Sequence, residues 1–360
     1  MDSSTGCVVL VTGGSGFLGQ HIVGLLQDRA DHVTEIRVLD VIPYENKLDY
    51  VERKPVKQYV GSVTDKDLVM RACKGVDCVM HVASIVDTSL IPDEEKSYRI
   101  NVKGTENVIA ACLKNGVKRL IYCSSAEVVT GSRNIYDGTE ENTDIETDQL
   151  FKPYGPTKIE AERLVLEANS SRLKTLSLRP VVMYGELEWR SLGLTVTGFL
   201  AKTFGSYVQI NCGKGLSEHV YVGNVAWGFV CAEINLYQDK VDKESIGRAY
   251  FLADGSPRTS VCSFMEDVMN EIGLKPIAMP LPVWFFVNSL YILYLILSVI
   301  SIVYRVNFFV GIPPFQCLER IFLFRYKSAT EKLGYIPIYS YVEAKTRTVN
   351  YFNPYVTSKG

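Results

Sequence analysis

Six short apolar runs alternate with segments of helical periodicity through the first half of the chain. The runs are CVVLVT, EIRVLD, VKQYVGS, DCVMHVAS, RLIYCSS and TLSLRPV. Apolar strands that are separated by helices are typical of a parallel sheet covered by helices on both faces. The pattern therefore predicts a doubly wound parallel α/β sheet of the Rossmann type over residues 1–185.

The remaining chain is less regular and predicts three further parts. Residues 186–275 mix strand-like and helical stretches, and we expect them to form a smaller substrate-binding cap. Residues 276–324 form an apolar segment that we expect to associate with a membrane. Residues 325–360 end in a helical stretch that needs an apolar surface, so we expect this tail to pack back on the cap.

Composition argues against several classes of function. The chain of 360 residues has 38 Lys and Arg against 40 Asp and Glu and lacks a basic block with interleaved aromatic residues, so we do not expect nucleic-acid binding. The four histidines are isolated from one another in the sequence, and we expect no metal site. The nine cysteines follow no disulfide framework, and we interpret them as small buried side chains in a reducing compartment. The sequence opens on a strand-like run rather than a signal-peptide pattern, which favours a catalytic part facing the cytosol.

A glycine-rich stretch, TGGSGFLG, follows the first apolar run. Gly13, Gly16 and Gly19 have the spacing G-x-x-G-x-x-G, a relative of the dinucleotide fingerprint. Glycines at these positions let the backbone turn tightly and approach a pyrophosphate at a helix N-terminus. Because the stretch lies between the first strand and the first helix, it predicts a dinucleotide site.

Asp40 ends the second apolar run, 21 residues after Gly19. An acid about 20 residues beyond the glycines hydrogen-bonds the ribose 2′-OH of NAD and would repel the 2′-phosphate of NADP. The next residues, Val41 and Ile42, offer no cation to hold such a phosphate. The sequence therefore predicts NAD as the cofactor.

The stretch YGPTK places a tyrosine and a lysine at the start of an amphipathic helix. Tyr154 and Lys158 are four residues apart, so a helix brings both to one face, one turn from each other. A nearby cation stabilises a phenolate and lowers the tyrosine pKa, whose ordinary value of about 10 is too high for a base near neutral pH. Ser124 and Ser125 end another apolar run and offer a hydroxyl to orient a substrate oxygen, and the choice between them stays open.

These stretches together resemble the 3β-hydroxysteroid dehydrogenase/Δ5-Δ4 isomerase family of the extended short-chain dehydrogenase/reductase superfamily. The resemblance covers nearly the whole chain and rests on VTGGSGFLGQHIV, EIRVLD, HVAS, YRINVKGTENVIAAC, YCSSAEV, YGPTK, LRPVVMYGE, HVYVGNVAW and the late apolar region. It implies NAD-dependent oxidation of the 3β-hydroxyl of a steroid or sterol to the ketone, with possible Δ5 to Δ4 isomerisation. Tyr154 would be the base, Ser125 the serine that orients the substrate, and Asn101 a support of the hydrogen-bond chain. The residues expected along the cofactor are Gly13, Gly16, Phe17, Leu18, Gly19, Asp40, Ser62, Val63, Ala83, Lys158 and Pro180.

Two positions depart from the family pattern. Relatives usually carry Gly-Asp after the third strand to contact the adenine amino group, whereas this chain has Gly61 and Ser62, which leaves Asp65 as an alternative contact. Steroid-isomerising relatives often show paired acids before Thr-Pro, whereas this chain has the single acid of Asp254-Gly255-Ser256-Pro257. The resemblance therefore implies the dehydrogenase activity more directly than the isomerase activity.

Two other functions stay open on the same sequence. A 4α-carboxysterol 3-dehydrogenase, in which oxidation triggers decarboxylation, would use the same set of Ser, Tyr and Lys. A non-catalytic nucleotide-sensing or scaffold protein is the alternative from another class, because a fold alone does not establish a function. An intact set of Ser, Tyr and Lys argues against it, since a sensor has no reason to keep these residues.

The late apolar region contains 29 consecutive residues without a charge, from Pro276 to Tyr304. About 20 apolar residues suffice to span the hydrocarbon of a bilayer, so the sequence predicts contact with membrane lipid, in the endoplasmic reticulum or mitochondria. A single crossing would separate the tail from the cap, and Pro313-Pro314 can turn the chain back. We therefore expect residues 281–324 to dip into one leaflet or form a hairpin. Homo-oligomerisation is left open.

Overall fold

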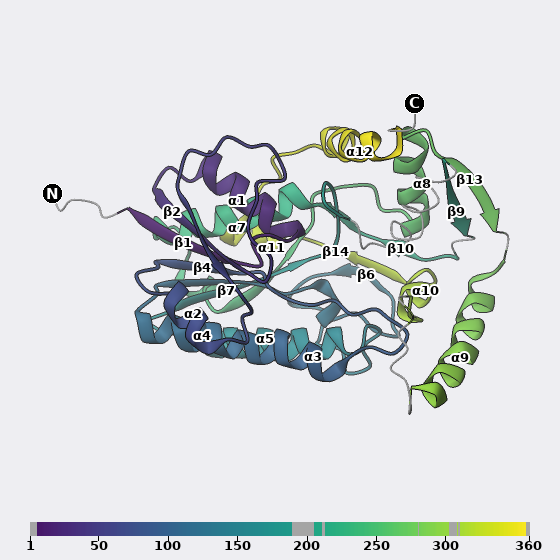
Figure 1. Cartoon of the computed structure of the whole chain (residues 1–360), viewed down its shortest axis with the longest axis horizontal. Helices are drawn as coiled ribbons and strands as arrows, with labels where there is room; N and C mark the ends of the chain where they lie inside the picture. Colours follow the sequence, from purple (N-terminus) through teal and green to yellow (C-terminus); the bar gives the residue numbers. More distant parts are fainter. Residues whose placement is uncertain are drawn as a thin grey trace.

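The computed structural model describes residues 6–188, 205–210, 213–279, 281–301, 308 and 310–357. At its centre lies a seven-stranded parallel sheet with the strand order β12-β7-β5-β4-β1-β2-β3 (Figure 1). Six of the strands are the six alternating runs, namely β1 (Cys7–Thr12), β2 (Val33–Asp40), β3 (Val56–Val60), β4 (Cys78–His81), β5 (Arg119–Cys123) and β7 (Lys174–Pro180). The predicted doubly wound fold is confirmed.

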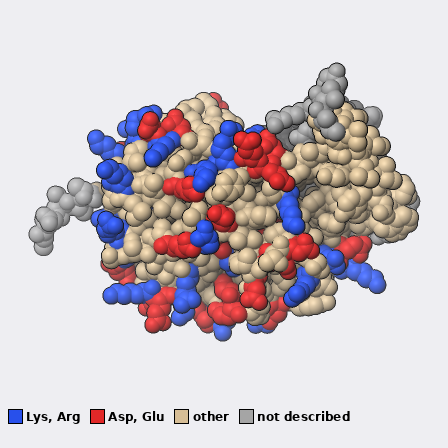
Figure 2. Space-filling model, turned by 90° about the horizontal axis from the view of Figure 1, so that it is seen from below, with Lys and Arg blue, Asp and Glu red and all other residues tan. Residues whose placement is uncertain are grey.

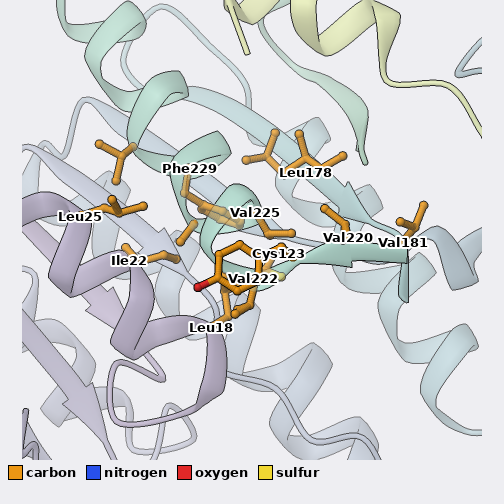
Figure 3. Packing of buried hydrophobic residues seen from close by; sticks show 14 of the residues in the cluster. Leu18, Ile22, Leu25, Cys123, Leu178, Val181, Val220, Val222, Val225 and Phe229 are labelled. Atoms are coloured by element: carbon orange, nitrogen blue, oxygen red, sulfur yellow. The ribbon is translucent and has the colours of Figure 1, made fainter. Parts of the chain in front are cut away.

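Helices cover both faces of this sheet, and each face has its own buried apolar cluster (Figure 1). One face carries α1 (Phe17–Arg29) and α7 (Val222–Tyr237), which pack against each other. Figure 3 shows Leu18, Ile22 and Leu25 of α1 close to Val222, Val225 and Phe229 of α7. The other face carries α2 (Lys66–Ala72), α4 (Gly104–Asn115) and α5 (Tyr154–Glu167). A short helix α3 (Glu94–Tyr98) runs through the π-helical turn η1 (Arg99–Lys103) into α4.

The sheet continues beyond residue 185, where we expected the nucleotide-binding domain to end. Strand β12 (Arg248–Leu252) pairs in parallel with β7 and forms an edge of the main sheet. Helix α7 is buried over most of its surface because it packs on β5 and β7, beside α1 and under α11. Residues 222–252 thus belong to the central α/β layers and not to the cap. Local periodicity identified the strand but could not tell which sheet it joins.

Smaller elements build the region beside the carboxyl ends of the central strands. Three small sheets are formed by parallel pairs, and several short helices connect them. The strands are β6 (Ile135–Gly138), β8 (Val182–Tyr184), β9 (Ser206–Ile210), β10 (Leu216–Ser217), β11 (His219–Tyr221), β13 (Lys275–Met279) and β14 (Ile321–Phe324). The helices are η2 (Ala126–Val128) and α8 (Val261–Glu271). Another short helix, η3 (Lys243–Ser245), precedes β12 at the opposite edge of the sheet.

Helix α9 (Val283–Ile300) is apolar and lies along the outside of the molecule (Figure 1). Its 18 residues have a mean hydropathy of 2.1 and only 11% of them are buried, which makes it the one candidate membrane helix among the described residues. Both ends of the surrounding segment are attached to the protein body. Before α9, β13 pairs with β9, and after it Leu90 N donates a hydrogen bond to Phe308 O at 2.9 Å. The Phe286 ring of α9 also stacks on Phe315 of α10 (Pro313–Cys317) at 5.5 Å.

The C-terminal tail forms α11 (Lys327–Leu333) and α12 (Tyr341–Thr357) and packs on the rest of the protein. The Asn224 side chain accepts hydrogen bonds from Ile338 N and Tyr339 N at 3.0 and 2.9 Å. Lys345 of α12 forms ion pairs with Asp267 and Glu271 of α8 at 2.7 and 2.6 Å. The tail is thus tied both to α7 and to the cap.

The cysteines follow the sequence interpretation with one exception. Seven of them are free and buried. Cys262, in the first turn of α8, is disulfide-bonded. The interpretation of all nine as unpaired side chains is therefore wrong for this residue, because the spacing of cysteines in a sequence does not tell which of them meet in space.

Candidate active site

The glycine-rich loop is packed too tightly for side chains. Gly13 has φ +74°, and a Cβ at this position would lie 2.8 Å from Ala83 N at the end of β4. A Cβ on Gly19 would lie 2.1 Å from Gly13 O. Gly16 is the N-cap of α1 and gives this helix no side-chain cap, so Phe17 and Leu18 begin a helix whose amides remain available to an anion. The loop has the shape that a pyrophosphate requires.

Asp40 lies directly beside this loop at the end of β2. Its Oδ2 accepts a hydrogen bond from Ser15 N at 3.0 Å, and its Oδ1 accepts one from Ile42 N at 3.2 Å. Ser15 Oγ also donates to Ile42 O at 2.9 Å, which ties the loop to the chain after β2. A carboxylate accepts about four hydrogen bonds, so Asp40 keeps capacity for a ribose hydroxyl. The geometry fits the predicted role.

The residues after β3, which we expected beside the adenine of the cofactor, form mainly local contacts. Ser62 Oγ accepts hydrogen bonds from Thr64 N and Thr64 Oγ1 at 3.1 and 2.9 Å. Val63 is buried and packs near Gly104, where an added Cβ would lie 2.6 Å from a Val63 methyl group. Asp65 caps α2 by accepting a hydrogen bond from Leu68 N at 3.0 Å. Asp65 therefore has a local structural role.

A buried chain of hydrogen bonds begins at the end of β1. Thr12 Oγ1 is 2.7 Å from His81 Nδ1, and His81 Nε2 is 2.9 Å from Thr105 Oγ1, which in turn donates to Asn101 O at 2.6 Å. Burial, followed by the charge of Lys158, lowers the pKa of His81 to about 3, so its imidazole is neutral. The sequence alone indicated HVAS only as a stretch that resembles the family. It did not predict that His81 links Thr12 to Thr105 through hydrogen bonds.

Asn101 connects this chain to the helix that carries the tyrosine. Its Nδ2 donates to Thr157 Oγ1 at 3.0 Å, and its Oδ1 accepts from Ile85 N at 2.8 Å. Thr157 Oγ1 then donates to Tyr154 O at 2.7 Å. Asn101 lies in the π-helical turn η1, an irregularity that is frequent at functional sites. The predicted support role of Asn101 remains a prediction, now with defined partners.

Lys158 is one turn after Tyr154 on α5, as the spacing predicts. The side chain is 1% exposed, and its Nζ donates a hydrogen bond to Cys123 O at 2.7 Å. The ammonium lies 5.8 Å from the centroid of the Tyr154 ring and 4.8 Å from that of Tyr122. Burial lowers the pKa of Lys158, while nearby Cys123 and Glu162 oppose this effect.

The pKa of Tyr154 is raised, whereas the sequence led us to expect a lower pKa because of the nearby Lys158. The side chain is partly exposed, yet enough protein surrounds the hydroxyl for burial to raise its pKa above the ordinary value. Cys123 and Glu127 raise this pKa further, and a hydrogen bond with Ser125 lowers it. Lys158 is not among the groups that shift this pKa, so the expected lowering is not found, and desolvation of the hydroxyl dominates.

The structure distinguishes the two candidate serines. Ser125 lowers the pKa of the Tyr154 hydroxyl, and its Oγ accepts a hydrogen bond from Glu127 N at 3.1 Å as the N-cap of η2. Ser124 is 2% exposed, and its Oγ has no hydrogen-bond partner within the described part of the chain. Ser125 thus has the geometry of a substrate-orienting hydroxyl. Pro180 ends β7 at the same edge of the sheet, beside Leu252 of β12.

A second polar cluster, which sequence spacing did not indicate, surrounds Glu233 of α7. Its Oε2 is 2.7 Å from His32 Nε2, and its Oε1 is 3.1 Å from Arg119 Nη2. Cys7, His32 and Glu233 offer potential ligand atoms within 4.8 Å of one another. The Arg119 cation lies in the same group and also donates to Cys7 Sγ at 3.1 Å, so we interpret the cluster as a buried ion pair.

Asp254, the single acid of the D-G-S-P stretch, is occupied by structural hydrogen bonds. Its Oδ2 accepts from Tyr221 N and Asn224 Nδ2, both at 2.8 Å. Its Oδ1 accepts from Ser256 N and Ser256 Oγ at 3.0 and 2.7 Å. Four donors fill the acceptor capacity of a carboxylate, so Asp254 holds a turn together.

Comparison with known proteins decides the family. A family description for the 3-beta hydroxysteroid dehydrogenase/isomerase family matches residues 10–283. The chain belongs to this family. The human 3 beta-hydroxysteroid dehydrogenase type 7 is 32% identical to it over 365 aligned positions, which cover 95% of this chain and 94% of the human protein. The family resemblance predicted from the sequence is confirmed.

Solved structures of low sequence identity share the fold of this family member. An epimerase from Methanothermobacter thermautotrophicus has a TM-score of 0.72 at 20% identity, with 96% of this chain and 92% of that chain covered. A dTDP-glucose 4,6-dehydratase double mutant from Streptomyces venezuelae, solved with NAD bound, has a TM-score of 0.70 at 18% identity and 96% coverage of both chains.

As a family member, the protein is an NAD-dependent oxidoreductase, and the predicted cofactor is confirmed. The glycine cradle, the uncapped α1 N-terminus and Asp40 fit this dinucleotide, as described above. When NAD is bound, it supplies an acceptor for a hydride.

Proposed function

We propose that this protein oxidises the 3β-hydroxyl of a steroid or sterol to the 3-ketone. The observation that carries the proposal is the buried Lys158 ammonium, which lies one helical turn after Tyr154 and 5.8 Å from the centroid of the tyrosine ring, with Ser125 just after the neighbouring strand β5. All three residues lie at the edge of the sheet where the glycine-rich loop also lies. Family membership supports the steroid or sterol as substrate.

In the proposed reaction, the substrate hydroxyl binds between Ser125 and Tyr154. Ser125 orients the oxygen by a hydrogen bond, and the Tyr154 phenolate takes the hydroxyl proton. The Lys158 ammonium stabilises that phenolate, and its hydrogen bond to Cys123 O fixes its position. Thr157 and Asn101 hold the first turn of α5 through the bond to Tyr154 O.

A flat apolar substrate such as a steroid or sterol is consistent with the apolar surface of helix α9. Helix α9 exposes large apolar side chains, among them Trp284 at 64%, Leu295 at 63% and Val299 at 67%. The corresponding side of the molecule is nearly free of charged residues, whereas Lys, Arg, Asp and Glu are interspersed over the central domain (Figure 2). We propose that α9 lies in one leaflet of a membrane of the endoplasmic reticulum or mitochondria, with the catalytic domain in the cytosol.

The experiment measures NADH formation and identifies the products. Protein in lipid vesicles is incubated with NAD and either a Δ5-3β-hydroxysteroid or a 4α-carboxysterol. We expect a 3-ketosteroid from the first substrate and no turnover with Tyr154→Phe. Loss of carbon dioxide from the second substrate, with no turnover of the first, would replace the proposal by the decarboxylating alternative. Turnover that Tyr154→Phe leaves unchanged would contradict the assigned base.

A further inference from the structure

A row of ring contacts joins helix α1, which follows the glycine-rich loop, to the tail helix α12. Phe17, the first residue of α1, contacts the His21 ring at a centroid distance of 6.2 Å. The His21 ring contacts Tyr221 of β11 at 6.2 Å, and the Tyr221 ring contacts Tyr339 of the tail at 5.2 Å. The Arg347 guanidinium of α12 lies 5.1 Å from the Tyr339 ring centroid. We call this meeting point the tail junction, and its members are His21, Glu186, Tyr221, Tyr339 and Arg347.

A buried carboxylate, that of Glu186, lies at the centre of the tail junction. Glu186 is two residues after the end of β8, and its side chain is 7% exposed. The Tyr221 hydroxyl donates to the carboxylate, with distances of 2.9 and 2.8 Å to the two oxygens. Arg347 Nε pairs with Glu186 Oε1 at 3.2 Å and donates to the Tyr221 hydroxyl at 2.9 Å. Within the described part of the chain this is the one ion pair of Glu186, so Arg347 supplies its counter-charge.

The tail junction also ties α1 to the chain that leaves β8. His21 Nε2 lies 3.3 Å from Glu186 O, and the imidazole is the donor because a carbonyl oxygen can only accept. Burial lowers the pKa of His21, so its ring is neutral and gives Glu186 no second counter-charge. Strand β8 follows directly on β7, where Leu178 O accepts a hydrogen bond from Ser124 N at 2.8 Å. The junction therefore touches both the helix behind the glycine-rich loop and the chain that leaves the catalytic edge of the sheet.

The Tyr221 ring has no room to move and compensate for a lost partner. The residue is 0% exposed, and a Cβ on Gly223 would lie 2.4 Å from its Cε1. A Cβ on Gly185 would lie 3.0 Å from its Cε2, and Gly185 has φ +140°, a conformation that other residues rarely adopt. Tyr221 N also donates to Asp254 Oδ2 at 2.8 Å. In such a close-packed arrangement, a lost member displaces its neighbours.

We propose that Arg347 is a positioning residue for the cofactor site, which holds α1 against the chain that leaves β8 so that the dinucleotide binds tightly. It acts through Glu186, whose carboxylate would otherwise be buried without a counter-charge. The proton-transfer machinery is held separately, because Lys158 is fixed by the carbonyl of Cys123 on β5. The inference rests on NAD as the cofactor and is independent of which alcohol is oxidised.

The test measures the binding of NADH in the absence of any steroid, by the fluorescence of the bound dinucleotide. Arg347→Met keeps a long unbranched side chain but removes the guanidinium, and we expect the Kd of NADH to rise roughly 5 to 50-fold. Lys345→Met is the matched control, because it removes a cation from the same helix whose partners, Asp267 and Glu271, belong to α8. Its Kd should equal that of the wild type. An equal loss of affinity in Lys345→Met would mean a general loosening of the tail and would overturn the inference.

Further variants test whether Arg347 acts through Glu186. Arg347→Lys keeps a positive charge and should retain most of the affinity for NADH. Arg347→Met should weaken binding much less in a Glu186→Gln background than in the wild type, because the charge that Arg347 balances is then absent. Asn224 fixes the tail independently through its bonds with Tyr339, so thermal unfolding should show that Arg347→Met remains folded. Wild-type affinity in Arg347→Met, or an equal effect in the two backgrounds, would overturn the inference.

Steady-state kinetics separates this role from catalysis. In Arg347→Met the KM for NAD should rise, while kcat at saturating NAD stays within about twofold of the wild type. A lower kcat with an unchanged KM for NAD would contradict a role in positioning the cofactor site. Protein that shows the expected changes in NADH binding but does not oxidise a 3β-hydroxysteroid would overturn the proposed function and support this inference.

Discussion

The Lys158 ammonium is held by the backbone carbonyl of Cys123 at 2.7 Å and lies 5.8 Å from the Tyr154 ring centroid. The lysine is thus fixed by β5 and does not depend on the tyrosine for its position. Its charge is buried, so it acts on the neighbouring hydroxyl through a medium that screens it little. The relationship makes the cation a permanent part of the tyrosine environment.

Replacement of Lys158 by Met should raise the pH needed for oxidation. The cation favours the phenolate, so its removal raises the Tyr154 pKa beyond the increase that burial already causes. We expect the acidic limb of the kcat/KM profile, along which the base becomes protonated, to move to higher pH and the rate at neutral pH to fall about 10² to 10⁴-fold. The control is Lys152→Ala, because the Lys152 side chain is 57% exposed and pairs with Asp148. Coincident profiles for wild type and Lys158→Met would refute the pairing.

The double change Asp40→Ala and Val41→Arg should move preference from NAD toward NADP. It removes the carboxylate that would repel a 2′-phosphate and places a guanidinium at a position that is 64% exposed. One charge-assisted hydrogen bond contributes about 1.5–3 kcal/mol, so the ratio of the two kcat/KM values should change about 10 to 100-fold. Asp67→Ala on α2 is the control, at another exposed acid. A constant ratio would mean that Asp40 does not contact the ribose.

Glu162→Ala should strongly destabilise the fold. Glu162 of α5 pairs with Arg179 of β7 at 2.5 Å, and the two side chains are 3% and 9% exposed. Removal of one partner leaves a buried arginine unpaired, which costs about 3–5 kcal/mol in the free energy of unfolding. Arg163→Ala breaks an exposed pair with Glu167 on the same helix and should cost less than about 1 kcal/mol. Urea unfolding measures both, and equal midpoints for the two variants would contradict the expectation.

The double change Ile292→Glu and Leu295→Glu should weaken binding to lipid vesicles. These side chains of α9 are 61% and 63% exposed, so the charges face outward and do not disturb the core. We expect a loss of at least tenfold in vesicle binding, because apolar contact area is replaced by charges that lipid solvates poorly. The control is Ile336→Glu with Val342→Glu, at tail positions that are 66% and 73% exposed. Flotation of vesicles measures the bound fraction, and similar losses for both double variants would remove α9 as the lipid contact.

A tag placed after Gly360 should be digested by protease added to intact, sealed microsomes. Before α9, β13 pairs with β9, and after α9 Leu90 N donates a hydrogen bond to Phe308 O, so the chain on both sides of α9 contacts the same protein body. The tail is therefore expected on the side of the active site. Protection of the tag until detergent is added would establish a single crossing and refute the hairpin.

The sequence by itself determined the central α/β layers and the one-turn spacing of the proposed catalytic pair. Alternating apolar runs have a local period, so all six predicted strands are found in one sheet. The glycine spacing and the four-residue separation of Tyr154 and Lys158 are also local, and the short-range geometry of a turn or a helix fixes their consequences.

Only the tertiary structure decided which distant segments meet. It placed β12 in the main sheet, gave Asp254 four structural donors and joined Arg119 to Glu233. Such contacts depend on how whole helices and sheets pack, and burial at those contacts sets the pKa values that the chemistry uses. Neither these contacts nor these pKa shifts can be predicted from a local period in the sequence.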